Sequence, residues 1–448
     1  MKARNRVRIS QCMIVKNEEK NIERALSWGK GIVSEQIVVD TGSTDRTVEL
    51  AEKMGATVYH FDWIDDFSAA KNYAISKAKH EWIAFLDADE YFTPEDGRKL
   101  QGFIQKLHES KYNCIMTGWI HLDNQGDVLA VGSQTRIFRN TPGLRYQGRI
   151  HEKVASVDNF PCVLVDAVEE LSIYHTGYGA IENQTKTESK RNLNLILAEL
   201  EDNPNNYDML GYLGDEYYSA YELDKAEEAF RKSISLMPKE SVNYDIRTTL
   251  TFEKLLSILS DKPDTEEKAF MDIYNQAIKK VPKEADFDYF AGRYFASRGD
   301  FKKGEEHLKR ALKILEEHGY TSKSMFLSAN IKEAYELLAA CSYNNENVEG
   351  CINSAVVLLK MDKYLMSTLF LLLMSFRQDE SNGKEGTAAS LVEFLGKNLY
   401  DFHILKDRLF VLKAAMKAEY QSLIQAIRGM FTPEELKIVD MALAKEEQ

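Results

Sequence analysis

Near the start of the chain, short apolar runs alternate with stretches in which apolar residues recur at helical spacing. Short apolar runs bounded by polar turns are typical of buried strands, and we expect strands at Ile9–Val15, Gln36–Asp40, Thr57–Phe61 and Trp82–Asp87. The stretches between them predict helices at Glu18–Trp28, Arg46–Met54 and Ser68–Ala78. Strands that alternate with helices in this way form a mainly parallel sheet, and its ligands bind beyond the carboxyl ends of the strands.

From about residue 185 the pattern becomes continuously helical and begins to repeat. Residues 207–238 match the tetratricopeptide template closely, through Leu210, Leu213, Gly214, Tyr217, Ala226, Phe230 and Pro238. A weaker match follows at Ala291, Gly292, Phe295, Gly304, Leu308 and Ala311, and traces of further repeats lie at Tyr274, Ala277, Pro282, Ala339 and Cys351. Because stacked repeats bury one continuous core, we expect a solenoid of about four helical pairs, capped by residues 400–448.

The two patterns together predict two domains. Residues 1–185 form an α/β domain with helices on the faces of a mainly parallel sheet, and residues 186–448 form an all-α domain of tetratricopeptide-like repeats.

Charge separates the same two parts of the chain. The 448 residues carry a net charge of −13, of which residues 1–190 contribute −3 and residues 191–448 contribute −10. An acidic chain is a poor match for the phosphate backbone of nucleic acids, so a nucleic-acid-binding function is excluded. The acidic repeats would suit a basic peptide or a second copy of the chain.

Neither the basic start of the sequence nor its cysteines indicate export. The basic start, Lys2–Arg8, lacks the apolar segment of a signal peptide, and the most apolar run, Leu365–Phe376, is too short to span a bilayer. The five cysteines are scattered and form no C-x-x-C pair, so we expect buried thiols rather than disulfides or a zinc site. These features predict a cytoplasmic protein without a transmembrane segment.

The most informative chemical signal is the run Asp87-Ala88-Asp89-Glu90 at the end of an apolar strand. Neighbouring carboxylates repel one another unless a cation or hydrogen-bond donors lie among them. Oxygen ligands at one small site suit Mg²⁺ or Mn²⁺, which usually share their coordination shell with substrate phosphates. A solvated turn with helix-capping carboxylates would explain the same run without a ligand.

Two further polar segments end neighbouring strands. Asp40 closes the second strand, where an acceptor-only group could take hydrogen bonds from a ribose or a base, and Asp45 is placed to cap the next helix. Residues 14–19, Ile-Val-Lys-Asn-Glu-Glu, end the first strand beside them.

These segments, in this order and spacing, resemble family 2 glycosyltransferases of the nucleotide-diphosphosugar-binding (GT-A) fold. The matching segments are residues 14–19, 40–45, 66–72 and 87–89. The resemblance implies that Val15 and Glu18 border the nucleotide, that Asp40 contacts the uracil or ribose, and that Asp87 faces the ribose. It implies that Asp89 binds the metal ion bridging the diphosphate. Lys71 would lie near the base or phosphates, although an Arg is common at its position.

Residues 134–178 supply the remaining candidates. His151 and Glu152 are adjacent, and sugar transfer needs a base that takes the proton of the acceptor. Because neighbours on a strand face opposite ways, we expect one of the two to point into the site, and we favour Glu152. His175 could complete the metal shell, as a C-terminal His does in many enzymes of this fold. Arg136 or Arg139 could stabilise the leaving diphosphate.

The whole layout resembles the sublancin-type peptide S-glycosyltransferases, which join a GT-A domain to tetratricopeptide repeats and modify cysteines of a bacteriocin precursor. The resemblance implies an inverting transfer from a UDP-sugar, with UDP-glucose or UDP-N-acetylglucosamine as donor and a Cys thiol or Ser/Thr hydroxyl of a peptide or protein as acceptor. Two alternatives stay open: a transferase that builds cell-surface polysaccharide or lipid-linked glycan, and a non-catalytic repeat scaffold with a relic sugar-nucleotide domain. The repeats could bind the acceptor or pair two subunits.

Overall fold

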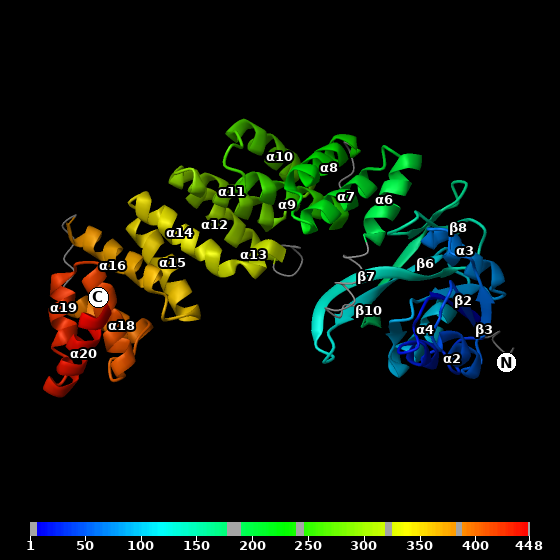
Figure 1. Cartoon of the computed structure of the whole chain (residues 1–448), viewed down its shortest axis with the longest axis horizontal. Helices are drawn as coiled ribbons and strands as arrows, with labels where there is room; N and C mark the ends of the chain where they lie inside the picture. Colours follow the sequence, from blue (N-terminus) through cyan, green and yellow to red (C-terminus); the bar gives the residue numbers. More distant parts are fainter. Residues whose placement is uncertain (1–6, 177–189, 239–245, 319–324, 382–387, 447–448) are drawn as a thin grey trace. The chain divides into compact units, whose positions relative to one another are not determined.

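The computed structural model describes residues 7–176, 190–238, 246–318, 325–381 and 388–446, and its chain divides into two compact units (Figure 1). The first unit is Met1–Met209 and the second is Leu210–Gln448. Helix α6 (Arg191–Asp202) therefore belongs with the sheet-containing unit.

The first unit is built on an eight-stranded sheet in the order β3-β2-β1-β4-β7-β6-β10-β5. Its strands are β1 (Ile9–Val15), β2 (Glu35–Asp40), β3 (Thr57–His60), β4 (Trp82–Phe85), β5 (Glu90–Phe92), β6 (Cys114–Leu122), β7 (Val128–Arg139) and β10 (Leu164–His175). The predicted parallel arrangement is confirmed for β1 to β4. The sheet as a whole is mixed, because β7 pairs antiparallel with both β4 and β6. A separate hairpin joins β8 (Leu144–Gln147) to β9 (Lys153–Ser156).

The apolar runs form the core of this sheet. Every residue of β4 is buried, and β1 is buried at all but one position, as expected for strands covered on both faces. Helices α1 (Ile22–Ser27), α2 (Thr47–Lys53), α3 (Phe67–Lys77) and α4 (Pro94–Lys106) follow the strands. Asp66 caps α3 by accepting a hydrogen bond from the backbone N–H of Ala69.

Two of the predicted elements differ from the structure by two or more residues at one end. The fourth strand stops at Phe85 instead of Asp87, because the chain turns there and the N–H of Glu90 donates to the carbonyl of Asp87. The first helix begins at Ile22 instead of Glu18, because the residues before it bond to the segment after β2: Ser43 accepts from the N–H of Asn17, and Thr47 at the start of α2 accepts from the N–H of Glu18. Both differences fall where strand ends carry polar residues.

The second unit is helical throughout its described residues, which confirms the predicted all-α class. Its helices are α7 (Tyr207–Ser219, which starts in the first unit), α8 (Leu223–Leu236), α9 (Ile246–Asp261), α10 (Glu267–Lys280), α11 (Ala285–Ser297), α12 (Phe301–His318), α13 (Met325–Ala329), α14 (Ile331–Asn344), α15 (Val348–Met361), α16 (Met366–Ser381), α17 (Ala388–Asn398), α18 (Leu405–Lys417), α19 (Gln421–Arg428) and α20 (Pro433–Glu446). The helices from α15 onward share one apolar core.

Small residues allow the paired helices to approach closely. A Cβ atom on Gly214 of α7 would lie 2.3 Å from the ring of Phe230 on α8. A Cβ atom on Gly292 of α11 would likewise lie 2.5 Å from the side chain of Leu308 on α12. These are the small and large positions of the tetratricopeptide pattern, so the sequence signal reflects direct packing between the two helices of a pair.

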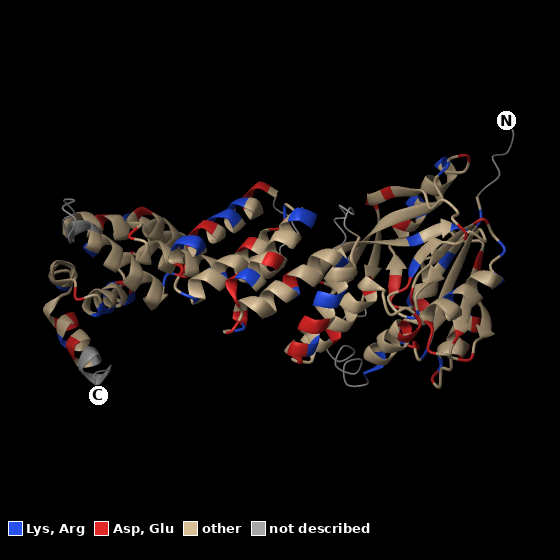
Figure 2. Cartoon of the chain, turned by 90° about the horizontal axis from the view of Figure 1, so that it is seen from above, with Lys and Arg blue, Asp and Glu red and all other residues tan. Residues whose placement is uncertain are grey.

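Charged residues of both signs are interspersed along the helices of the second unit (Figure 2). Some are buried and fully bonded: Asp288 accepts hydrogen bonds from Tyr274 at 2.8 Å and from Arg310 at 2.8 Å, and lies 2.7 Å from Nδ1 of His307. No helix among the described residues has the length and apolar character needed to cross a membrane.

The cysteines depart from the expectation of buried thiols at one position. Cys12, Cys114, Cys341 and Cys351 are buried and unpaired by disulfides, but Cys162 is exposed. It precedes β10 in a loop, where its sulfur lies 3.3 Å from that of Cys114.

We predict that Gly214→Ala lowers the free energy of unfolding by about 1–3 kcal/mol, because the added methyl group overlaps the Phe230 ring in a packed core. Gly396→Ala on α17 is the matched control. Its Cβ would meet its nearest atoms at 3.4 Å, and alanine favours the helix by up to about 1 kcal/mol. Urea unfolding followed by circular dichroism measures both; equal stabilities of the two variants would contradict this packing.

Candidate active site

The first unit contains a cavity of about 490 Å³ at the carboxyl ends of β1, β2 and β4. The segment before β9, the end of β10 and the start of α6 complete its wall. Nine of the sequence-predicted site residues line it: Val15, Glu18, Lys71, Asp87, Asp89, Arg136, His151, Glu152 and His175. Asp40 is not among the lining residues.

Asp87, whose side chain is 32% exposed, lies at the centre of a charge cluster whose other members are largely buried. Its Oδ1 is 3.0 Å from Nζ of Lys71 on α3, and its Oδ2 is 2.7 Å from a guanidinium nitrogen of Arg136 on β7. The same Arg136 nitrogen is 2.7 Å from Glu90, and Lys71 is 2.7 Å from Glu152. We call Lys71, Asp87, Glu90, Arg136 and Glu152 the charge cluster.

The charge cluster shifts the pKa values of its members in opposite directions. Burial raises the pKa of Asp87, but the positive charges of Arg136 and Lys71 outweigh it, so that the pKa lies below its ordinary value. Burial lowers the pKa of Lys71, and the attraction of Asp87 and Glu152 more than reverses that effect. Glu90 has a raised pKa because it is fully buried and close to Asp87 and Asp89. Lys71 and Asp87 are therefore both charged at neutral pH.

Asp89 is not part of the charge cluster, and its carboxylate contacts His175. Its Oδ2 lies 3.2 Å from Nε2 of His175, at the end of β10. The backbone holds the two residues together, because the N–H of Thr176 donates to the carbonyl of Asp89. The predicted pair of metal ligands is thus adjacent.

The donor set at this point fits a small divalent cation. A carboxylate oxygen and an imidazole nitrogen face one another on the cavity wall, and with a cation bound they would leave its other ligand positions to waters and phosphate oxygens. Asp87 is a poorer candidate ligand, since both its oxygens are already paired with cations.

His151 and Glu152 both line the cavity, contrary to the expectation that only one would. Side chains alternate between two faces only where His151 and Glu152 lie in a strand. The segment before β9 is a bend in which His151 has a left-handed backbone with φ of 51°, so the strand alternation does not apply. A contact with Lys71 at 2.7 Å holds Glu152 in place.

Asp40 and Arg139 lie outside the cavity wall. The buried carboxylate of Asp40 accepts hydrogen bonds from the backbone N–H groups of Gly42 and Ser43, and so shapes the turn after β2. Arg139 lies at the far end of β7, where it pairs with Glu81 at 2.6 Å and donates to backbone carbonyls. Asp45 accepts from the N–H of Thr47, the first residue of α2, but the N-cap position belongs to Arg46 instead of the predicted Asp45, because α2 begins one residue later than expected.

The structure adds residues that the sequence reasoning did not assign. Glu90 was part of the acidic run, but only the turn after β4 shows that its carboxylate bonds to the N–H of Asp87 and to Arg136. Trp119 of β6 lines the cavity beside Arg136, whose guanidinium carbon lies 6.0 Å from its ring. A single tryptophan on a strand carries no motif, so nothing in the sequence pointed to it.

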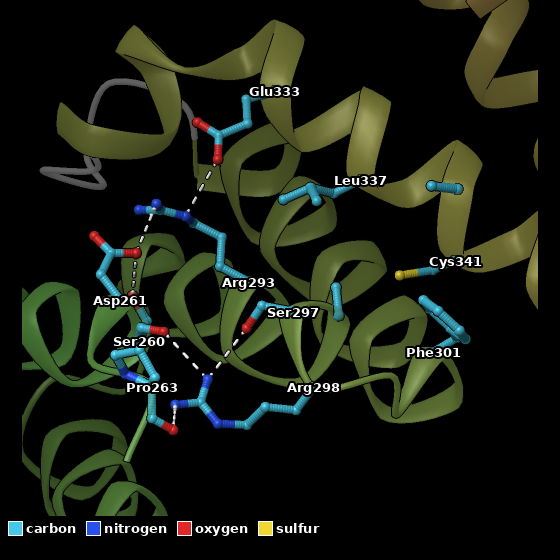
Figure 3. A pocket seen from close by; sticks show the side chains of 12 residues that line it. Ser260, Asp261, Pro263, Arg293, Ser297, Arg298, Phe301, Glu333, Leu337 and Cys341 are labelled. Carbon is cyan, nitrogen blue, oxygen red and sulfur yellow. Dashed lines mark hydrogen bonds and ion pairs between the residues drawn. The ribbon is translucent and has the colours of Figure 1, made fainter. Parts of the chain in front are cut away.

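A second cavity, of about 570 Å³, lies within the helical unit among α9, α11 and α14 (Figure 3). At one end Arg293 bridges Asp261 at 2.8 Å and Glu333 at 3.2 Å. Leu337, Phe301 and Cys341 line the other, apolar end. This cavity combines an ion-paired end with an apolar one.

Residues 10–153 match the family model described as glycosyl transferase family 2. The chain is 31% identical over 244 residues to a TPR repeat-containing protein of Synechococcus elongatus, covering 53% of this chain and 59% of the relative. It is 31% identical over 228 residues to the SPbeta prophage-derived glycosyltransferase SunS of Bacillus subtilis, covering 50% of this chain and 52% of the relative. The match thus spans little more than half of each relative's length.

Among solved structures, glucosyl-3-phosphoglycerate synthase from Mycobacterium tuberculosis is 23% identical, with a TM-score of 0.23 over 25% of this chain and 44% of that one. A similarity this low has no bearing on function. The sequence matches do confirm the predicted resemblance: the first unit carries a family 2 glycosyltransferase domain, and a helical unit follows it.

We predict that Lys71→Met lowers the free energy of unfolding at pH 7 by about 3–5 kcal/mol, because Asp87 and Glu152 lose a buried partner. The exposed Lys53→Met is the control and should change stability by less than about 0.5 kcal/mol.

The amount by which Lys71→Met lowers the free energy of unfolding, here called the deficit, should also depend on pH. The depressed pKa of Asp87 contributes stability that is present above the unfolded pKa of about 4 and is lost as the pH falls below it. Because Lys71 causes part of that depression, the deficit shrinks between pH 7 and pH 3.5. Urea unfolding at the two pH values measures it, and a deficit that grows in acid would contradict this charge assignment.

Proposed function

We propose that this chain, with its family 2 glycosyltransferase domain, is an inverting enzyme that transfers a sugar from a UDP-sugar to a peptide or protein. The proposal depends on one observation above all: Asp87, Asp89, Glu152 and His175 line a single cavity at the carboxyl ends of the parallel strands. That edge is where open α/β sheets bind their ligands. UDP-glucose and UDP-N-acetylglucosamine are the proposed donors.

Asp89 and His175 would hold a Mg²⁺ or Mn²⁺ ion, which when bound would neutralise negative charge on the departing diphosphate. Val15 and Glu18 border the space for the nucleotide, and Asp87 faces the same space from its fixed position between Lys71 and Arg136. Asp40 would act on the nucleotide through the turn that its carboxylate shapes, since it does not line the cavity. The roles of all these residues are part of the proposal.

The reaction forms one bond and breaks another at the anomeric carbon. The acceptor oxygen or sulfur attacks from the face opposite UDP, the bond from the anomeric carbon to the diphosphate oxygen breaks, and the acceptor proton passes to Glu152. Lys71 lies 2.7 Å from Oε1 of Glu152 and holds its carboxylate at the cavity wall. His151 is the alternative base.

Two features support a peptide or protein as the acceptor. Stacked helical repeats form elongated surfaces that suit extended chains, and the groove among α9, α11 and α14 offers both apolar and charged contacts. The second unit is also acidic overall, which suits a basic peptide.

We predict that the purified protein hydrolyses a UDP-sugar slowly in the presence of Mn²⁺, and that Asp89→Ala lowers this rate at least 100-fold. Asp127→Ala, in the exposed turn between β6 and β7, is the control and should retain the wild-type rate. A panel of UDP-sugars with coupled detection of UDP identifies the donor. Wild-type turnover by Asp89→Ala would rule out the proposed metal site.

We predict that Glu152→Gln reduces transfer to a hydroxyl acceptor about 10²- to 10⁴-fold while UDP binding is retained, because the proton acceptor is lost. His151→Asn, which keeps a residue that tolerates the left-handed backbone, should have a much smaller effect. Intact-mass analysis of acceptors captured from cell extract shows the product: a hexose-sized increment on a peptide supports the proposal, and a glycolipid product contradicts it.

A further inference from the structure

His121 of β6 lies against the predicted metal ligand His175. The Nδ1 atoms of the two rings are 3.2 Å apart, which is hydrogen-bond distance, and the ring centroids are 5.1 Å apart. The opposite nitrogen of His175, Nε2, is the one that faces Asp89 at 3.2 Å. The three side chains therefore form a continuous line, His121–His175–Asp89.

The backbone and an aromatic neighbour fix this arrangement. Strands β6 and β10 are parallel here, and their register places His121 directly beside His175. The ring of Trp119 packs against both imidazoles, with centroid distances of 4.1 Å to His121 and 5.3 Å to His175. Each histidine is only 9% exposed, so neither ring has room to turn freely.

A histidine that binds a metal ion through Nε2 must carry its proton on Nδ1, because the metal ion occupies the lone pair of Nε2. That Nδ1–H then needs an acceptor, and such a partner fixes both the tautomer and the orientation of the ring. In a contact between two Nδ1 atoms, one ring donates and the other accepts. Nδ1 of a neutral His121 with its proton on Nε2 can accept.

We propose that His121 is a positioning residue for the metal site: it accepts a hydrogen bond from Nδ1–H of His175 and so presents Nε2 of His175, deprotonated, to the cation. His121 itself contacts neither donor nor acceptor in this role. The inference rests on the proposed function, since it assigns His175 as a metal ligand, and it extends that function to a residue that belongs to no motif.

The test compares two substitutions of His121 in the full-length protein. His121→Leu removes the acceptor but keeps an apolar side chain of similar width beside Trp119. His121→Asn retains an acceptor, because its amide oxygen is attached to Cγ, as Nδ1 is in histidine. Mn²⁺ binding is measured by electron paramagnetic resonance, from the loss of the free Mn²⁺ signal, with UDP at saturation and without it. Thermal unfolding is recorded for each variant.

We expect His121→Leu to weaken Mn²⁺ binding roughly 10- to 100-fold, and His121→Asn to restore most of the loss. A purely structural role would change thermal stability without separating the two variants in Mn²⁺ affinity. Equal Mn²⁺ affinity of His121→Leu and wild type, or equal losses in both variants, would overturn the inference.

Mn²⁺ binding by the wild type and by His175→Ala distinguishes a failure of the inference about His121 from a failure of the proposed function. If the wild type binds Mn²⁺ and His175→Ala does not, the metal site stands and the variants at His121 decide the inference alone. If the wild type does not bind Mn²⁺ with UDP present, the metal site of the proposed function fails, and the inference that rests on it fails as well.

Discussion

The neutralisation of Asp87 by two buried cations is the interaction on which the first unit depends. Lys71 reaches Asp87 from α3 and Arg136 reaches it from β7, so one carboxylate links a helix and two strands that are distant in sequence. A buried charge without a partner costs several kcal/mol, so moving any of these elements would carry a large penalty. The charge cluster therefore fixes the turn after β4, and with it the place of Asp89.

The carboxylates of the turn after β4 have two kinds of surroundings. Asp87 and Glu90 are committed to cations and backbone groups inside the protein, while Asp89 lies at the cavity beside His175. Asp87 and Glu90 make the turn rigid, and Asp89 and His175 are the pair that the proposed function assigns to a cation. In a single run of acidic residues, the distances between the groups thus separate the ion-paired carboxylates from the one at the cavity.

The second unit is stabilised on a different principle. Its paired helices interlock through small residues that accommodate large ones, as Gly214 accommodates Phe230, and the helices from α15 onward share one apolar core. Buried polar groups such as Asp288 are matched by several donors. Packing of this kind makes the second unit a scaffold. The cavity that Arg293 lines presents both charged and apolar side chains on that scaffold.

The sequence by itself determined the classes of both units, because strand and helix periodicities and the tetratricopeptide pattern record local packing directly. It also indicated nine residues that line the cavity, some because polar residues at the ends of parallel strands meet at one edge, and the others through the resemblance to family 2 glycosyltransferases. Only the tertiary structure decided that Asp40 faces its own turn, that Arg139 lies at the far end of β7, and that His151 and Glu152 share the cavity. The roles of Glu90, Trp119 and His121 likewise depend on contacts between distant strands and turns, and side-chain partners that meet across a sheet leave no periodic signal in the sequence.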